Sequence, residues 1–202
     1  MNLQHTPVLV IGAGIMGAGI AQVAAQAGHP VQLFDMREGA AAAAKVKLAA
    51  TLDGLVAKGK LAADAAAATL ARITPIAALA EAAQAGLVVE AIVEDLGAKR
   101  SLFQQLEGIV AESCVLATNT SSISVTAIAN GLKKPGRLVG MHFFNPVPLM
   151  KLVEVVSGLQ TARDVADAIF ALSKLWNKVP VHCKSTPGFI VNRIARPYYA
   201  ET

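Results

Sequence analysis

The feature that most constrains the fold is a glycine-rich turn between an apolar strand pattern and a helix pattern. Residues 8–11 read Val-Leu-Val-Ile, and Gly12-Ala13-Gly14-Ile15-Met16-Gly17 follows directly. In this spacing the first glycine permits a tight turn, the second lets the backbone approach a pyrophosphate, and the third allows the helix to pack closely on the strand. The helix N-terminus also offers free N–H groups to phosphates. The pattern predicts a dinucleotide site, and the alternative is a glycine turn that serves packing alone.

An acidic residue further along narrows the choice of dinucleotide. Asp35 ends the next apolar run, residues 31–34. A carboxylate at this place accepts hydrogen bonds from a ribose diol and repels a 2′-phosphate, which favours NAD over NADP. Arg37 is close enough in the sequence to weaken the preference for NAD over NADP. The expected cofactor is therefore NAD, and the expected contacts in this part of the chain are Gly12, Gly14, Ile15, Met16, Gly17 and Asp35.

The rest of the chain alternates short apolar runs with helical patterns. This alternation predicts an α/β fold, a Rossmann-type doubly wound and mostly parallel sheet covered by helices on both faces. The expected strands are 8–11, 31–34, 73–76, 87–91, 115–117, 138–143, 149–156 and 179–183. The expected helices are 15–27, 96–112, 125–132 and 162–175, with a helical hairpin inserted at about 37–72 and a last helix opened by Thr186 and Pro187.

Composition excludes several classes of function. The net charge of +4 comes from scattered residues, and no basic run predicts a nucleic-acid groove. The two cysteines, Cys114 and Cys183, form no CxxC pattern, so neither a disulfide framework nor a metal centre is expected and the cytoplasm is the expected location. The apolar stretch 7–28 contains five glycines, and no Lys or Arg precedes it, which argues against a signal sequence or a membrane span.

Unusual polar residues stand at the ends of three further predicted strands. Glu90 and Glu94 follow one strand, residues 119–122 (Asn-Thr-Ser-Ser) follow the next, and His142 and Asn145 end a third. Ligands in doubly wound sheets bind outside the carboxyl ends of the strands. These residues are therefore expected to share one site with the glycine turn.

His142 is the candidate for proton transfer. A single histidine at a strand end is more often structural than catalytic, but Glu154 lies within the apolar run 152–156, where an unpaired carboxylate would be costly. Pairing with Glu154 would orient the ring and make it more basic. The alternative is that Glu154 points to solvent from an edge strand.

Six segments together carry a resemblance to a known family. They resemble the L-3-hydroxyacyl-CoA dehydrogenases, and the resemblance covers essentially the whole chain. The segments are Val10–Gly17 (VIGAGIMG), Val89–Glu94 (VEAIVE), Thr118–Ser122 (TNTSS), Gly140–Pro148 (GMHFFNPVP), Lys151–Val156 (KLVEVV) and Thr186–Arg193 (TPGFIVNR).

The resemblance implies an NAD-dependent oxidoreductase of fatty acid β-oxidation type that converts an L-3-hydroxyacyl-CoA to a 3-ketoacyl-CoA. His142 matches the family's catalytic base and Glu154 its partner. Ser121 and Asn192 match residues that hold the substrate's reacting oxygen and thioester region. The further matched positions are the cofactor contacts Glu94, Lys99, Ser121 and Asn145 beside Asp35, and the CoA contacts Lys58 and Thr51 on the hairpin, where threonine replaces a serine of some members.

The family also implies a division into domains. We expect residues 1–186 to form the NAD-binding domain and 187–202 to begin a helical domain for substrate binding and homodimer formation, so that this chain alone would have low activity. Two other functions stay open at this point. One is a dehydrogenase of a free 3-hydroxy acid or sugar acid, and the other is a non-catalytic NAD-binding module.

Overall fold

The computed structural model describes residues 1–200, with side chains as far as residue 195. One sheet of eight strands runs through it in the order β3-β2-β1-β4-β5-β6-β7-β8. The first six strands pair in parallel, β7 runs antiparallel to β6, and β8 is parallel to β7. The strands are β1 (Val8–Ile11), β2 (Val31–Phe34), β3 (Ile73–Pro75), β4 (Leu87–Glu90), β5 (Val115–Thr118), β6 (Leu138–Phe143), β7 (Leu152–Ser157) and β8 (Val179–Lys184). The predicted Rossmann-type, mostly parallel sheet is confirmed.

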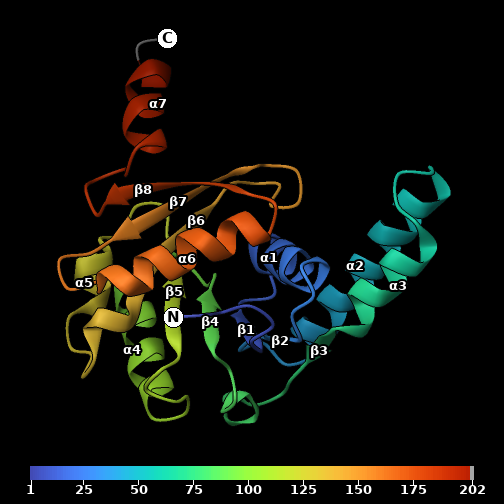
Figure 1. Ribbon diagram of the computed structural model, residues 1–202, viewed down its shortest axis with the longest axis horizontal. Coiled ribbons are helices and arrows are strands. Elements are labelled where there is room, and N and C mark those ends of the chain that lie inside the picture. The colour runs from blue at the N-terminus through green and yellow to red at the C-terminus, as the bar shows by residue number, and fades with distance from the viewer. Residues whose placement is uncertain (201–202) are drawn as a thin grey trace.

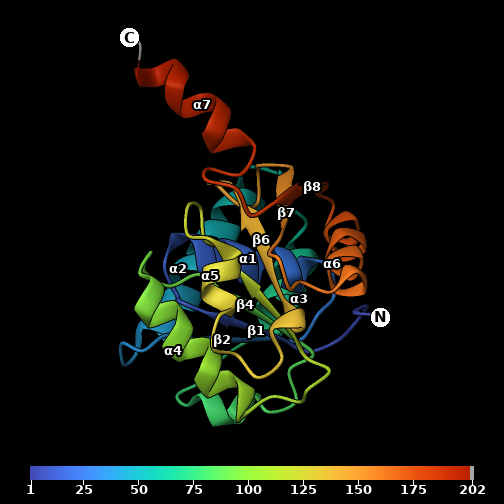
Figure 2. The same ribbon diagram turned by 90° about the vertical axis from the view of Figure 1, so that its left-hand side faces the viewer.

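Helices cover both faces of this sheet (Figures 1 and 2). One apolar cluster joins the sheet to α1 and α6, and a second joins its other face to α4 and α5. The antiparallel pair of α2 and α3 is the predicted hairpin, and α7 projects away from the sheet (Figure 1). The helices are α1 (Ile15–Gln26), α2 (Ala40–Ala57), α3 (Ala63–Ala71), α4 (Leu96–Glu107), α5 (Val125–Ala129), α6 (Arg163–Leu175) and α7 (Val191–Ala200), with short 3₁₀ turns at Leu79–Ala82 and Pro135–Arg137.

The apolar runs explain why the inner strands lie at the centre of the molecule. All residues of β1, β4, β5 and β6 are buried. A parallel strand covered by helices on both faces is apolar along most of its length, and in these strands the exceptions Glu90, Thr118 and His142 lie at or near the carboxyl ends. Within residues 1–200, no helix combines the length and the apolarity needed to cross a membrane.

Four predicted boundaries were wrong by three residues or more, and one of them is the end of α5, which lies at Ala129 and not at residue 132 because the backbone of Asn130 is extended. The last helix begins at Val191 and not at Thr186, because Gly188 and Phe189 have positive φ angles of 73° and 50° that a helix does not admit. Strand β7 begins at Leu152 because residues 146–150 form a hydrogen-bonded turn. Helix α4 ends at Glu107, before Gly108.

Candidate active site

The glycine turn lies at the carboxyl end of β1, where α1 begins. Gly12 has a φ of 99°, and a Cβ built on it would lie 2.4 Å from the carbonyl oxygen of Ala91. A Cβ on Gly17 would lie 1.7 Å from the carbonyl oxygen of Gly12. Gly14, the N-cap of α1, has open space within 4 Å of its Cβ position. The first and third glycines are thus needed for the fold itself, and the second leaves the backbone open to a pyrophosphate.

This difference among the glycines yields a prediction. Gly14→Ala should lower Tm by only about 2–4 °C, because alanine is a slightly poorer N-cap than glycine. The same variant should bind NADH about tenfold or more weakly, because the new methyl group occupies the path of the phosphates. Calorimetric titration measures the affinity, and Gly54→Ala, at an equally open position in α2, is the matched control. NADH affinity within twofold of wild type would contradict this role of Gly14.

Asp35 lies directly beyond β2 and is fully hydrogen-bonded. Its carboxylate accepts from the backbone N–H of Ala13 at 2.8 Å, from the backbone N–H of Arg37 at 2.9 Å and from the Arg37 guanidinium at 3.0 and 3.1 Å. The hydrogen bonds from the Arg37 side chain are the main reason that the pKa of Asp35 falls to about 2. The carboxylate is therefore ionised at neutral pH and lies against the glycine turn.

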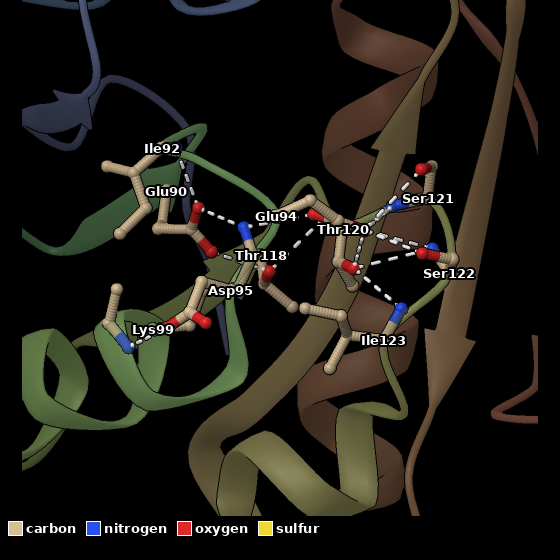
Figure 3. Close-up of polar contacts among 11 residues, drawn as sticks. Glu90, Ile92, Glu94, Asp95, Lys99, Thr118, Thr120, Ser121, Ser122 and Ile123 are labelled. Carbon is tan, nitrogen blue, oxygen red and sulfur yellow. Dashed lines mark hydrogen bonds and ion pairs between the residues drawn. The ribbon is translucent and has the colours of Figure 1, made fainter.

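Glu94 lies above the end of β5 and is held by several donors (Figure 3). Its Oε1 accepts from the hydroxyl of Thr120 and from the backbone N–H groups of Ser121 and Ser122, the last two at 2.8 and 3.1 Å. Burial opposes ionisation of this carboxyl, but these hydrogen bonds and the ammonium of Lys99 outweigh it and lower the pKa of Glu94 to about 2. Glu94 thus fixes the conformation of the loop that carries Ser121.

Because the pKa of Glu94 is lower in the native protein, the free energy of unfolding should fall as the pH falls through the acid range. In the unfolded chain the carboxyl titrates near 4.5 and in the native protein near 2, so its stabilising effect is complete above about pH 4.5 and is lost as the pH falls toward 2. Glu94→Gln should therefore make Tm less sensitive to pH between about pH 5 and 3. Scanning calorimetry measures this slope, and the exposed Glu38→Gln is the control. A wild-type slope in Glu94→Gln would show that the carboxylate contributes nothing to folding.

Lys99 lies beneath Glu94 and is completely buried. Its ammonium lies 2.5 Å from Glu90, whose side chain is also fully buried, and 3.4 Å from Glu94 (Figure 3). Glu90 accepts two further hydrogen bonds, from the Thr118 hydroxyl and from the Ile92 backbone. The sequence pattern identified Glu90 as a strand-end residue but not as the partner of Lys99.

His142 and Glu154 face each other across β6 and β7. They are register partners in this antiparallel pair, which puts their side chains on the same face of the sheet. The Nδ1 atom of His142 lies 2.7 Å from Oε2 of Glu154. Glu154 is fully buried, and β8 pairs with β7 so that β7 is not an edge strand, so the solvent-facing alternative does not hold. In the tautomer with the proton on Nδ1, the N–H donates a hydrogen bond to the carboxylate, and Nε2 keeps its lone pair free for a substrate.

The beginning of α7 joins this pair to the Glu94 loop. The other oxygen of Glu154 accepts from the backbone N–H groups of Ile190 and Val191, both at 2.9 Å. The next residue, Asn192, donates from its side-chain amide to the carbonyl oxygen of Ser121 at 3.1 Å. Buried carboxylates are stable where such donors satisfy them. Residues 190–192 therefore connect the expected catalytic residues Ser121, His142, Glu154 and Asn192.

The aromatic neighbours of His142 were not among the expected site residues. The ring of His142 packs against Phe144 and Phe189, with centroids 4.6 and 5.7 Å away. Asn119 accepts the backbone N–H of Phe143 at 2.9 Å and so ties the end of β5 to the end of β6. Asn119 belongs to the polar cluster 119–122 that was expected at this site, whereas nothing in the spacing singles out Phe189.

A groove of about 560 Å³ runs beside the glycine turn and α2. Asn145 lines it together with Gly14 and Ile15, and from the hairpin side Thr51 lines it too. Lys58 does not, because it caps the far end of α2. The groove thus connects the glycine turn to one of the two expected CoA contacts. Within residues 1–200, no group of three side chains is arranged to hold a metal ion.

Known proteins match this chain over its whole length. The family described as "3-hydroxyacyl-CoA dehydrogenase, NAD binding domain" matches residues 7–186. The 3-hydroxyadipyl-CoA dehydrogenase of Escherichia coli K12 is 52% identical over 100% of this chain and 42% of its own length. The mitochondrial hydroxyacyl-coenzyme A dehydrogenase of Homo sapiens is 45% identical over 96% of this chain and 64% of its own length.

Solved structures agree with these sequence matches. A crystal structure of 3-hydroxybutyryl-CoA dehydrogenase from Escherichia coli K12 superposes with a TM-score of 0.95 at 52% identity, covering 97% of this chain and 42% of that one. The chain thus spans about two fifths to two thirds of the length of these relatives. The NAD cofactor of the family fits the open backbone at Gly14 and the carboxylate of Asp35. By sequence and by fold, the chain belongs to the 3-hydroxyacyl-CoA dehydrogenase family and contains its NAD-binding domain.

Proposed function

We propose that the protein oxidises an L-3-hydroxyacyl-CoA to a 3-ketoacyl-CoA, with His142 as the general base. The observation that carries this proposal is the buried pair of His142 and Glu154, joined through residues 190–192 to Ser121. NAD, when bound, supplies the acceptor for the hydride that leaves C3 of the substrate. Nε2 of His142 takes the proton from the C3 hydroxyl, and Glu154 keeps the ring in the tautomer that can do so.

The other matched residues have supporting roles in this proposal. Gly14, Ile15, Met16 and Asp35 line the cofactor, and the Ser121 hydroxyl and the Asn192 amide hold the substrate's oxygen and thioester region. Asn145 lies in the groove beside the glycine turn, which suits a cofactor contact. Lys99 is buried, so we propose that it acts through Glu94 and does not touch the cofactor.

A CoA thioester is the favoured substrate class. Relatives named for acyl-CoA substrates are 44–52% identical to the chain, whereas a solved NAD-dependent dehydrogenase of a pyridine carboxylic acid is only 28% identical. Thr51 lines the groove that connects the hairpin to the glycine turn, which suits a contact with CoA. Homodimer formation and a domain boundary at residue 186 remain predictions.

Comparing two substrates tests the proposed function. The intact protein should oxidise NADH with acetoacetyl-CoA at least about a hundredfold more efficiently in kcat/KM than with free acetoacetate, since remote binding energy supports the chemical step. Lys58→Ala should raise KM for acetoacetyl-CoA and leave the reaction with acetoacetate unchanged. Lys133→Ala, at an exposed position away from the hairpin, is the control. Equal efficiency with both substrates would favour a free-acid dehydrogenase, and no turnover with either would favour a binding module.

A further inference from the structure

The hydrogen-bonding capacity of Asp35 is used up within the chain. An ionised carboxylate has about four acceptor positions. Four donors take them: the backbone N–H groups of Ala13 and Arg37, and the Nε and one terminal nitrogen of the Arg37 guanidinium. A ribose diol that donates to this carboxylate therefore needs at least one of these donors to leave.

The guanidinium is the donor that can leave without moving the backbone. Ala13 belongs to the glycine turn, and the backbone N–H of Arg37 is held by its position two residues after Asp35. The side chain of Arg37, by contrast, is 74% exposed, while that of Asp35 is 9% exposed. Because solvent reaches the guanidinium, water can replace its hydrogen bonds when a ligand displaces it from Asp35. Arg37 also lines the groove beside the glycine turn, and a released guanidinium has space there.

We propose that Arg37 sets how strongly this protein discriminates between NAD and NADP. It competes with the ribose diol for Asp35, which weakens NAD binding, and it offers a bidentate cation to a 2′-phosphate, which strengthens NADP binding. The proposal rests on the proposed contact between Asp35 and the ribose. If the proposal holds, the protein prefers NAD over NADP less strongly than it would if Asp35 had no arginine bound to it.

Nucleotide titrations of Arg37→Leu test this proposal without any turnover. The variant should bind NADH about two- to fivefold more tightly than wild type, because an exposed pair no longer competes for Asp35. It should bind NADPH about tenfold more weakly, because a charge-assisted contact to the phosphate is lost. Arg163→Leu removes an arginine that is 96% exposed on α6 and should change neither affinity.

Repeating the Arg37→Leu substitution in an Asp35→Asn variant tests whether Arg37 acts by competing for Asp35. In Asp35→Asn, adding Arg37→Leu should give no further gain in NADH affinity, because the carboxylate for which Arg37 competes is gone. The proposal is overturned if Arg37→Leu leaves the ratio of NADH to NADPH affinity within twofold of wild type. It is also overturned if the variant binds NADH more weakly, since Arg37 would then contact the cofactor directly. These titrations measure nucleotide affinity and do not require turnover. A protein that binds nucleotide as expected but has no dehydrogenase activity would therefore contradict the proposed function and not this proposal.

Discussion

Replacing His142 by glutamine should lower kcat by about 10²–10⁴ and leave NADH affinity within twofold of wild type. Glutamine keeps much of the volume and polarity of the side chain but cannot take a proton from the substrate hydroxyl. The affinity should hold because most of the expected cofactor contacts, among them the glycine turn and Asp35, lie at other strand ends. Steady-state oxidation of NADH with acetoacetyl-CoA measures kcat in the intact protein, and calorimetry measures NADH binding.

Two comparisons make the His142 result specific. His182→Gln changes a half-exposed histidine on β8 and should leave kcat unchanged. Glu154→Gln should lower kcat as well, because its amide nitrogen can face Nδ1–H where an acceptor is needed. A kcat within threefold of wild type in His142→Gln would rule out this residue as the base.

Lys99→Met should be among the most destabilising single substitutions in the chain. It leaves the fully buried carboxylate of Glu90 without its counter-ion, and breaking a buried pair in this way costs about 3–5 kcal/mol. For a domain of this size the loss corresponds to a fall in Tm of about 6–20 °C. Thermal unfolding followed by circular dichroism measures it.

The double variant Lys99→Met/Glu90→Gln tests the cause of this destabilisation. Removing the charge of Glu90 should restore a large part of the lost stability, because no unpaired charge then stays buried. Lys133→Met, at an exposed position, should change the free energy of unfolding by less than about 0.5 kcal/mol. If Lys99→Met and Lys133→Met unfold at the same temperature, the buried ion pair contributes nothing.

The local parts of the fold could be predicted because their physical causes are local. Positions 12 and 17 need glycine because backbone atoms lie too close for a Cβ atom. The regular spacing of the glycines in the sequence shows this requirement. The inner strands are apolar, except near their carboxyl ends, because helices cover both faces of the sheet. The hairpin was visible in the apolar spacing of α2 and in the Gly59 turn that follows it.

The parts that could not be predicted depend on contacts between distant segments. Whether Glu154 pairs with His142 depends on β7 lying inside the sheet and antiparallel to β6, and spacing does not contain that information. The start of α7 was placed too early because the spacing does not show the positive φ angles of Gly188 and Phe189, nor that Glu154 of another strand accepts the N–H groups of Ile190 and Val191. Nothing in the spacing shows either that the ammonium of Lys99 is buried between Glu90 and Glu94.

The most direct test of the central claim follows the hydrogen that is transferred. The intact protein is incubated with acetoacetyl-CoA and with NADH that carries deuterium at the transferable position of the nicotinamide, and the product is analysed by mass spectrometry and chiral separation. We expect L-3-hydroxybutyryl-CoA with one deuterium at C3 from the wild type, and almost none from His142→Gln. A wild-type product without deuterium at C3, or equal labelled product from both proteins, would contradict the assignment of His142 as the base of a 3-hydroxyacyl-CoA dehydrogenase.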